Sequence, residues 1–167
     1  NIVHDVNAEL VLILAGDHVY KMDYAVMLAE HVARRAQVSI ACIEVPLADA
    51  VNFGVMAVDD EGRIVAFDEK PACPWSLSGS YDRALASMGI YVFDAGLLCE
   101  QLARDAADPN SSHDFGRDVI PRLLDNHRVM AHRFAESCVN MVGERPYWRD
   151  VGTIDSYWEA NMDLTKV

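Results

Sequence analysis

Three short segments carry side chains that can act on a phosphate group: Gly16-Asp17-His18, Glu69-Lys70-Pro71 and the loop around Asp150. Asp17 follows an apolar run, and a carboxylate in that place either caps the next element or binds a metal ion. Its surroundings in the sequence favour neither alternative. Asp150 precedes a predicted helix and can likewise serve as part of a cap, yet two aromatic residues and an arginine beside it favour a function for the loop.

Lys70 can bind a phosphate as a point charge. Pro71 favours an extended backbone at the preceding residue, which would project the Lys70 amine outward. The alternative is a solvated Glu69-Lys70 pair at a strand end, and for an isolated motif that alternative is favoured. The histidines His18, His113 and His132 have no metal-ligand spacing and are interpreted as ordinary polar residues.

Composition narrows the class of protein. A net charge of −12 and a pI near 4.7 leave no basic stripe for a nucleic-acid backbone, so nucleic-acid binding is not expected. No apolar run reaches the roughly 20 residues of a membrane span, so no membrane partner is expected either. The four cysteines are widely spaced, which argues against a zinc site or a disulfide scaffold and favours a reducing, cytoplasmic location.

The elements that position these residues alternate between strands and helices. The apolar run 10–15 predicts a parallel strand buried on both faces and places Asp17 at its carboxyl end. Asp23 can cap a following helix, and residues 38–43 predict the next strand. The three elements form a β-α-β unit, for which a right-handed crossover is expected.

The rest of the chain continues this pattern. Residues 55–58 and 63–67 predict an antiparallel hairpin around a glycine-containing turn. Ser87 opens a strand that runs to residue 93, and Asp94 then caps a helix. Further elements are a short helix over 114–124, a strand over 129–134 and a last helix over 153–164 capped by Thr153.

In their order along the chain, several motifs resemble one family, the nucleotidyltransferases that join a nucleoside triphosphate to a sugar 1-phosphate. Within it, they are most similar to the bacterial members that adenylylate glucose 1-phosphate. The resemblance covers essentially the whole chain and depends on the residues Leu14 to Tyr24, Asn52 to Met56, Glu69-Lys70-Pro71, Ala86 to Phe93, Asn110 to Gly116 and Tyr147 to Thr153.

The resemblance implies an α/β, Rossmann-like nucleotide-diphospho-sugar transferase fold with a mixed, mostly parallel sheet flanked by helices. It implies that Asp17 and Asp150 bind Mg²⁺ and that Lys70 binds the phosphate of glucose 1-phosphate. These three residues form the expected catalytic set. Glu69, Gly54 and Ser87 are expected to line the sugar site together with Lys70, and Gly54 suits a close approach of ligand to backbone.

The implied reaction joins ATP and glucose 1-phosphate to give ADP-glucose and pyrophosphate, the committed step of bacterial glycogen synthesis. No covalent intermediate is required, so alignment of two anions and screening of their repulsion would account for catalysis. The full-length protein is expected to be a homotetramer.

The chain departs from the family in what it lacks. No segment matches the Gly-rich loop that wraps the triphosphate, and the family's early central strand and C-terminal left-handed β-helix have no counterpart. Residues 1–167 are therefore interpreted as a partial catalytic domain, its sugar-phosphate half. We expect these residues alone to turn over ATP poorly or not at all.

Two alternatives remain. One is another nucleotide-sugar pyrophosphorylase on the same scaffold, selective for a different base. The other is a non-catalytic regulatory subunit of the same fold, against which the presence of Asp17, Lys70 and Asp150 argues.

Overall fold

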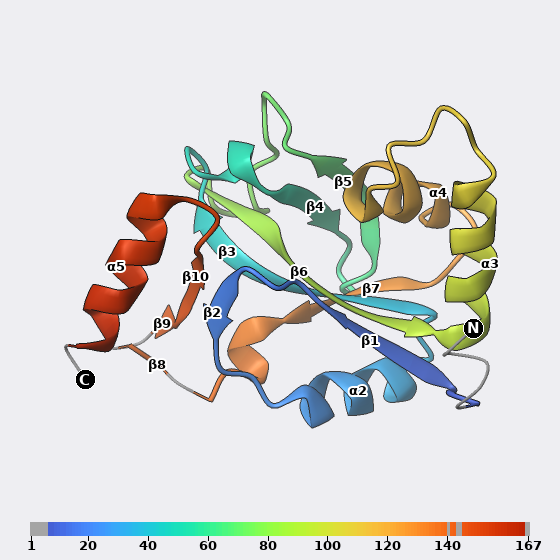
Figure 1. Ribbon diagram of the computed structural model, residues 1–167, viewed down its shortest axis with the longest axis horizontal. Coiled ribbons are helices and arrows are strands. Elements are labelled where there is room, and N and C mark those ends of the chain that lie inside the picture. Colours follow the sequence, from blue (N-terminus) through green and yellow to red (C-terminus); the bar gives the residue numbers. More distant parts are fainter. Residues whose placement is uncertain (1–6, 140, 143–144, 166–167) are drawn as a thin grey trace.

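The computed structural model describes residues 7–139, 141–142 and 145–165, which form a mixed β-sheet with helices on both faces (Figure 1). The main sheet has the strand order β5-β4-β6-β3-β7, and β1 also pairs with β6. Its strands are β1 (Leu10–Leu14), β3 (Val38–Pro46), β4 (Gly54–Val58), β5 (Ile64–Glu69), β6 (Arg83–Asp94) and β7 (Val129–Arg133). The α/β class expected from the sequence is confirmed.

The long strand β6 organises this sheet. One of its edges pairs antiparallel with β3, and the other pairs antiparallel with β4 near its start and with β1 near its end. Among the described strands of the main sheet, only β3 and β7 pair in parallel. Parallel pairing therefore does not dominate, because β6 runs opposite to each strand that it contacts. The same reason makes β1 antiparallel, and its residues are half-buried or exposed, in contrast to the parallel, doubly buried strand expected over 10–15.

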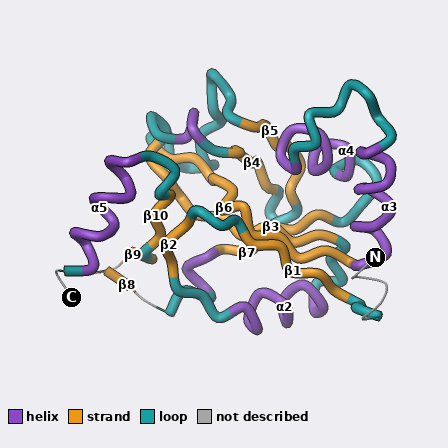
Figure 2. The backbone as a smooth tube through the Cα atoms, in the orientation of Figure 1, coloured by secondary structure: helices purple, strands orange, loops and turns teal. Residues whose placement is uncertain are grey.

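Helices cover the two faces of the sheet, as Figure 2 also shows. Helix α2 (Tyr24–Ala33) places Met27 against Met88 and Ile90 of β6 on one face. On the other face lie α3 (Ala95–Ala106), the π-helical turn η2 (Phe115–Val119) and α4 (Ile120–Leu123). Successive strand residues point to opposite faces, so Ile40 and Ala41 of β3 enter different cores. Within the described residues, no helix has the length and apolar character that crossing a membrane requires.

The caps of the helices agree with the sequence in two cases and differ in a third. Asp23 accepts a hydrogen bond from the backbone of Ala25 and so caps α2. Thr153 and Ser156 form a reciprocal capping box at the start of α5 (Ile154–Leu164). Helix α3 begins after Asp94 as expected, but that carboxylate makes no capping hydrogen bond. It lies 3.4 Å from Nε2 of the buried His31, so the prediction that it caps α3 is wrong.

Two short ribbons complete the described structure. Strand β2 (His18–Tyr20) pairs with β10 (Trp148–Asp150), and β8 (Met141–Val142) pairs with β9 (Arg145–Pro146). The single-turn helices η1 (Ala50–Asn52) and η3 (Phe134–Glu136) lie in connections. The β2–β10 ribbon and α5 lie together at one end of the sheet in Figure 1.

Strand β1 leaves one side of its backbone unpaired within the part of the chain that the structure describes, because it bonds only to β6. Its five residues are all apolar, and Leu14 is 44% exposed. An unpaired apolar edge of this kind is a template for pairing with another strand. We therefore expect the 167-residue chain to self-associate through β1.

Leu14→Lys should reduce this self-association, measured by sedimentation velocity over a concentration series, because a charge on an edge strand opposes pairing. Leu14 is already exposed, so the free energy of unfolding should change by about 0.5 kcal/mol or less. The matched control is Val26→Lys on α2, whose side chain has a similar exposure but lies away from the edge. Equal association of both variants and the wild type would show that β1 is not the contact.

Candidate active site

The pairing of β2 with β10 brings the two predicted metal-binding carboxylates together. In this ribbon Asp150 lies directly opposite His18, and the backbone nitrogen of Val151 donates to the carbonyl of Asp17 at 3.0 Å. Asp17 occupies the turn before β2, and Asp150 ends β10. Residues far apart in the sequence thus meet because a short antiparallel ribbon fixes their register.

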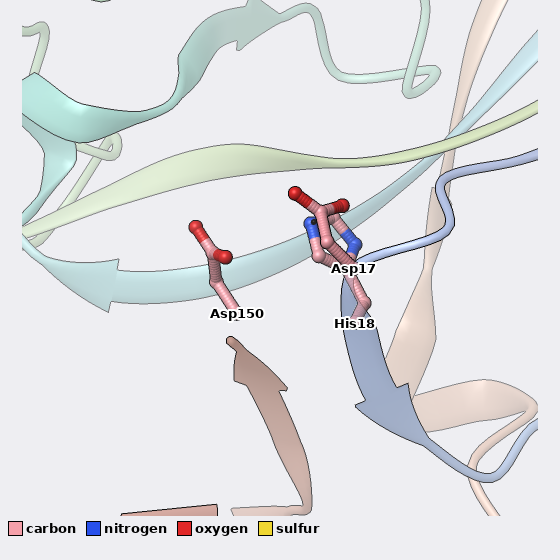
Figure 3. A group of neighbouring side chains, drawn as sticks. All are labelled: Asp17, His18 and Asp150. Carbon is pink, nitrogen blue, oxygen red and sulfur yellow. Dashed lines mark ion pairs between the residues drawn. The ribbon is translucent and has the colours of Figure 1, made fainter. Parts of the chain in front are cut away.

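Asp17, His18 and Asp150 each offer a donor atom within 4.8 Å of the others, a spacing that can hold one metal ion (Figure 3). His18 Nε2 is 3.5 Å from Asp17 Oδ1, and Gly152 donates its backbone N–H to Asp150 Oδ1 at 2.8 Å. Carboxylate oxygens suit Mg²⁺, whereas an imidazole nitrogen also suits transition metals. The residues present therefore fit a divalent cation.

His18 is a candidate that the sequence interpretation missed. The sequence predicts an ordinary polar residue here, because no second histidine or cysteine stands at a metal-ligand spacing. In the structure its side chain is 11% exposed and lies beside both carboxylates. The one sequence feature that could have indicated a metal-binding role for His18 is its neighbour Asp17. The third residue of the cluster, Asp150, comes from a distant segment.

The residues expected to line the sugar site lie on three adjacent strands. Glu69 of β5 lies directly opposite Gly54 of β4. The next residue of β4, Val55, pairs with Ala86 of β6, which places Ser87 beside the same end of β4. Ser87 does not open its strand as expected, since β6 begins at Arg83. The structure thus brings these three predicted residues together.

Lys70 follows Glu69 but does not have the extended backbone predicted from Pro71. Its φ of 51° lies in the left-handed region, and its N–H donates to the carbonyl of Phe53 at 3.1 Å. The chain turns sharply here as it leaves β5, and this hydrogen bond holds the turn. A non-glycine residue in this conformation carries strain, which is commonly found at functional sites. The side chain of Lys70 is exposed.

Glu69 has an unusual electrostatic environment. Burial, followed by repulsion from Asp114, raises the pKa of its carboxyl group above the ordinary value, against the opposing effects of Lys70 and Arg117. Nearby, burial raises the pKa of Tyr91, and a hydrogen bond to Ser87 opposes this rise. Asp114 and Tyr91 were not singled out from the sequence because their proximity to Glu69 depends on the packing of η2 over β5 and β6.

Aromatic side chains connect the carboxylate cluster, which consists of Asp17, His18 and Asp150, to the segment that leads into the strand row. The strand row consists of Glu69, Gly54 and Ser87. Trp148 packs edge-on against His18 at 5.1 Å between ring centroids and against Phe53 at 5.4 Å. Phe53 directly precedes Gly54. Among the described residues, Trp148 Nε1 is buried without a hydrogen-bond partner. Trp148 thus packs between His18 and the segment that leads into β4.

A bulge in β6 allows this close approach. Gly89 has a φ of +66°, and the register between β3 and β6 shifts over the segment that contains it. A Cβ at Gly89 would lie 3.5 Å from the ring of His18 and 3.0 Å from Ala15. Glycine thus provides the backbone conformation and leaves space for Ala15, which leads into the turn before β2.

This arrangement can bind an anionic ligand with the help of a cation. Its carboxylates repel phosphate, so a bound divalent ion at Asp17 and Asp150 would cancel their negative charge and offer a ligand position to a phosphate oxygen. Lys70 supplies a positive charge at the other end of the site. A divalent cation at the carboxylates and the Lys70 amine would both attract the oxygens of a phosphorylated ligand.

Comparison with known proteins agrees with this geometry. A family model described as "Nucleotidyl transferase" matches residues 1–167, and the chain belongs to that family.

Its relatives include the glucose-1-phosphate adenylyltransferases of Methylobacillus flagellatus, Nitrosospira multiformis and Paramagnetospirillum magneticum. These are 62%, 58% and 59% identical over the full length of this chain. The chain spans 39% of the length of each of the three relatives. The resemblance inferred from the motifs is thereby confirmed.

Asp150→Asn should weaken Mn²⁺ binding by about tenfold or more, because changes even outside the immediate ligands commonly cost that much. Isothermal titration of the protein with Mn²⁺ measures the effect, and Asp60→Asn in the β4–β5 turn is the charge-matched control.

His18→Ala should weaken Mn²⁺ binding more than Mg²⁺ binding, since an imidazole nitrogen favours the softer ion. Unchanged affinity in Asp150→Asn would exclude the cluster as the metal site.

Glu69→Gln should raise the melting temperature at about pH 7, and the gain should shrink toward about pH 3.5. The pKa of Glu69 is raised in the folded state, so the unfolded chain loses this proton first as pH rises. Stability is then lost between the unfolded and folded pKa values, and glutamine removes that loss. Glu100→Gln on α3 is the control, and a gain that persists at low pH would contradict the assignment.

Proposed function

We propose that this chain forms the sugar-phosphate half of a glucose-1-phosphate adenylyltransferase, which converts ATP and glucose 1-phosphate into ADP-glucose and pyrophosphate. Two observations carry the proposal: Asp17 and Asp150 converge, and Glu69, Gly54 and Ser87 align on three adjacent strands. The names and identities of the relatives support the same activity. A homotetrameric assembly and a cytoplasmic location remain predictions.

The chain's own residues would bind and orient the sugar phosphate. Lys70 would hold the phosphate group, because its exposed amine follows directly after the strand row. The half-buried Glu69 carboxylate would accept hydrogen bonds from sugar hydroxyls, and Ser87 would line the same pocket. Gly54, which has no side chain, would leave room beside β4 for the Glu69 carboxylate and the ring of Phe67.

The reaction forms one bond and breaks one. A phosphate oxygen of glucose 1-phosphate bonds to the α-phosphorus of ATP, and the bond from that phosphorus to the bridging oxygen breaks, releasing pyrophosphate. Mg²⁺ held by Asp17 and Asp150 would neutralise negative charge on the phosphates. Lys70 and the strand row would keep the attacking oxygen in line, and such positioning dominates phosphoryl-type transfer.

The test is a chimera in which these 167 residues replace the matching residues of the Methylobacillus flagellatus relative. Pyrophosphate release from ATP and glucose 1-phosphate should occur in the chimera and fall by about 100-fold or more with Asp17→Asn. Lys70→Ala should raise KM for glucose 1-phosphate by about tenfold or more and change KM for ATP little. Arg104→Ala on α3 is the charge-matched control.

The same assay separates the alternatives. Release with UTP or dTTP but not with ATP would assign a different nucleotide to this scaffold. A folded chimera that is inactive with every nucleotide would refute catalysis and favour the non-catalytic, regulatory reading.

A further inference from the structure

Two glycines enclose the carboxylate of Glu69, one on each side. Gly54 faces it from β4, and Gly116 faces it from the π-helical turn η2. A Cβ built on Gly54 would lie 2.8 Å from Glu69 Oε2, and a Cβ built on Gly116 would overlap Oε2 and lie 3.1 Å from Cδ. Neither position has room for a methyl group while Glu69 keeps its place.

Space is what requires glycine at position 116. Its φ lies outside the left-handed region, so an alanine could adopt the same backbone without strain. Gly116 is buried, and the three atoms beyond its own helix that would lie nearest to a methyl group belong to Glu69 and to the ring edge of Phe67. Glycine is therefore required at this position by the space that its neighbours occupy, and not by its own backbone conformation.

The turn that carries Gly116 is held firmly. Asp118 accepts hydrogen bonds from the backbone of Ser112 at 3.1 Å and of Asp114 at 3.1 Å. Phe115 stacks on Tyr91 of β6 with ring centroids 5.6 Å apart. These contacts hold the backbone of Gly116 in place, whereas Glu69 Oε2 is the end of a flexible side chain. An added methyl group would move the carboxylate and leave the turn in place.

Gly54 differs from Gly116 in this respect. A Cβ at Gly54 would lie 2.6 Å from Cζ of Phe67, whose ring is 7% exposed and belongs to the core. Substitution there would disturb core packing as well as the site. Gly116 is therefore the position at which the location of the Glu69 carboxylate can be changed with least disturbance to the core.

We propose that Gly116 is a positioning residue: because it has no side chain, it leaves the space in which the Glu69 carboxylate lies at the sugar end of the site. The assignment of a sugar ligand to Glu69 rests on the proposed function. The placement of the carboxylate by Gly116 does not, so the two parts can be tested separately.

The first experiment measures the carboxylate directly in the 167-residue chain. Gly116→Ala should displace Glu69 from its half-buried position, so its pKa should move toward the ordinary value. A ¹³C NMR pH titration of the glutamate side-chain carbonyls reports this change, with Glu69→Gln identifying the resonance. The groups whose charges act on Glu69 are Asp114, Lys70, Arg117 and Asp68, and the variant leaves all of them in the sequence.

Gly96→Ala in α3 is the matched control. No atom lies within 4 Å of a Cβ built on Gly96, so the same chemical change meets no neighbour. Its titration should follow that of the wild type. An unchanged Glu69 titration in Gly116→Ala would overturn the proposal.

The second experiment measures binding of glucose 1-phosphate by isothermal titration. Gly116→Ala should weaken binding by about tenfold, because small displacements of a positioned group cost affinity and rate. Glu69→Asp shortens the side chain and makes room for the methyl group. In the double variant the loss should therefore be smaller than the sum of the two single losses. Strict additivity would contradict a contact between the two positions.

Two further outcomes are decisive. If Gly116→Ala lowers the melting temperature, recovery in the double variant with Glu69→Asp assigns the loss to the same contact, and failure to recover refutes it. If the Glu69 titration responds while neither the wild type nor any variant binds glucose 1-phosphate, the positioning role stands and the sugar assignment fails.

Discussion

The antiparallel pairing of β2 with β10 is the interaction on which the site depends. Its described register consists of three residue pairs, and the last of them sets Asp150 against His18. Such a short ribbon has little stability of its own. Packing supports it on both sides, since Trp148 is buried against His18 and Phe53, and Arg149 forms an ion pair with Asp163 of α5 at 3.2 Å. Helix α5 therefore helps to hold the carboxylate cluster from outside it.

The charge distribution follows from this arrangement. A protein with a net charge of −12 gathers Asp17, Asp150 and Glu69 around a site proposed for phosphorylated ligands. Such a site is unfavourable for anions until cations are present, so ligand binding and cation binding should be strongly coupled. Burial, and then the nearby Asp114, raises the pKa of Glu69, so this carboxylate is also unfavourably placed for its charge. Lys70 and Arg117 oppose this effect at Glu69.

The sequence predicted the elements better than their contacts. Apolar runs and turn residues located the strands and helices, and side-chain chemistry identified the caps Asp23 and Thr153. The sequence could not reveal that Asp94 contacts His31, because that contact joins segments that are distant along the chain. The left-handed backbone of Lys70 was also missed, since it depends on a hydrogen bond to Phe53.

The candidate site shows the same division. Resemblance to a family identified Asp17, Glu69, Lys70 and Asp150, and the structure brings the two aspartates together. Gly116 belongs to one of the motifs that carry the resemblance, but the resemblance assigns it no role. Its role depends on the clearance between η2 and β5, which only the packed structure defines.

The burial of Trp148 gives this site a built-in optical reporter. The other two tryptophans, Trp75 and Trp158, are 41% and 62% exposed, whereas Trp148 is 7% exposed and touches the ring of His18. The blue edge of the protein's fluorescence should therefore arise from the junction between the carboxylate cluster and the strand row. Occupation of either half of the site can then be followed by light emission, without any label attached to the protein.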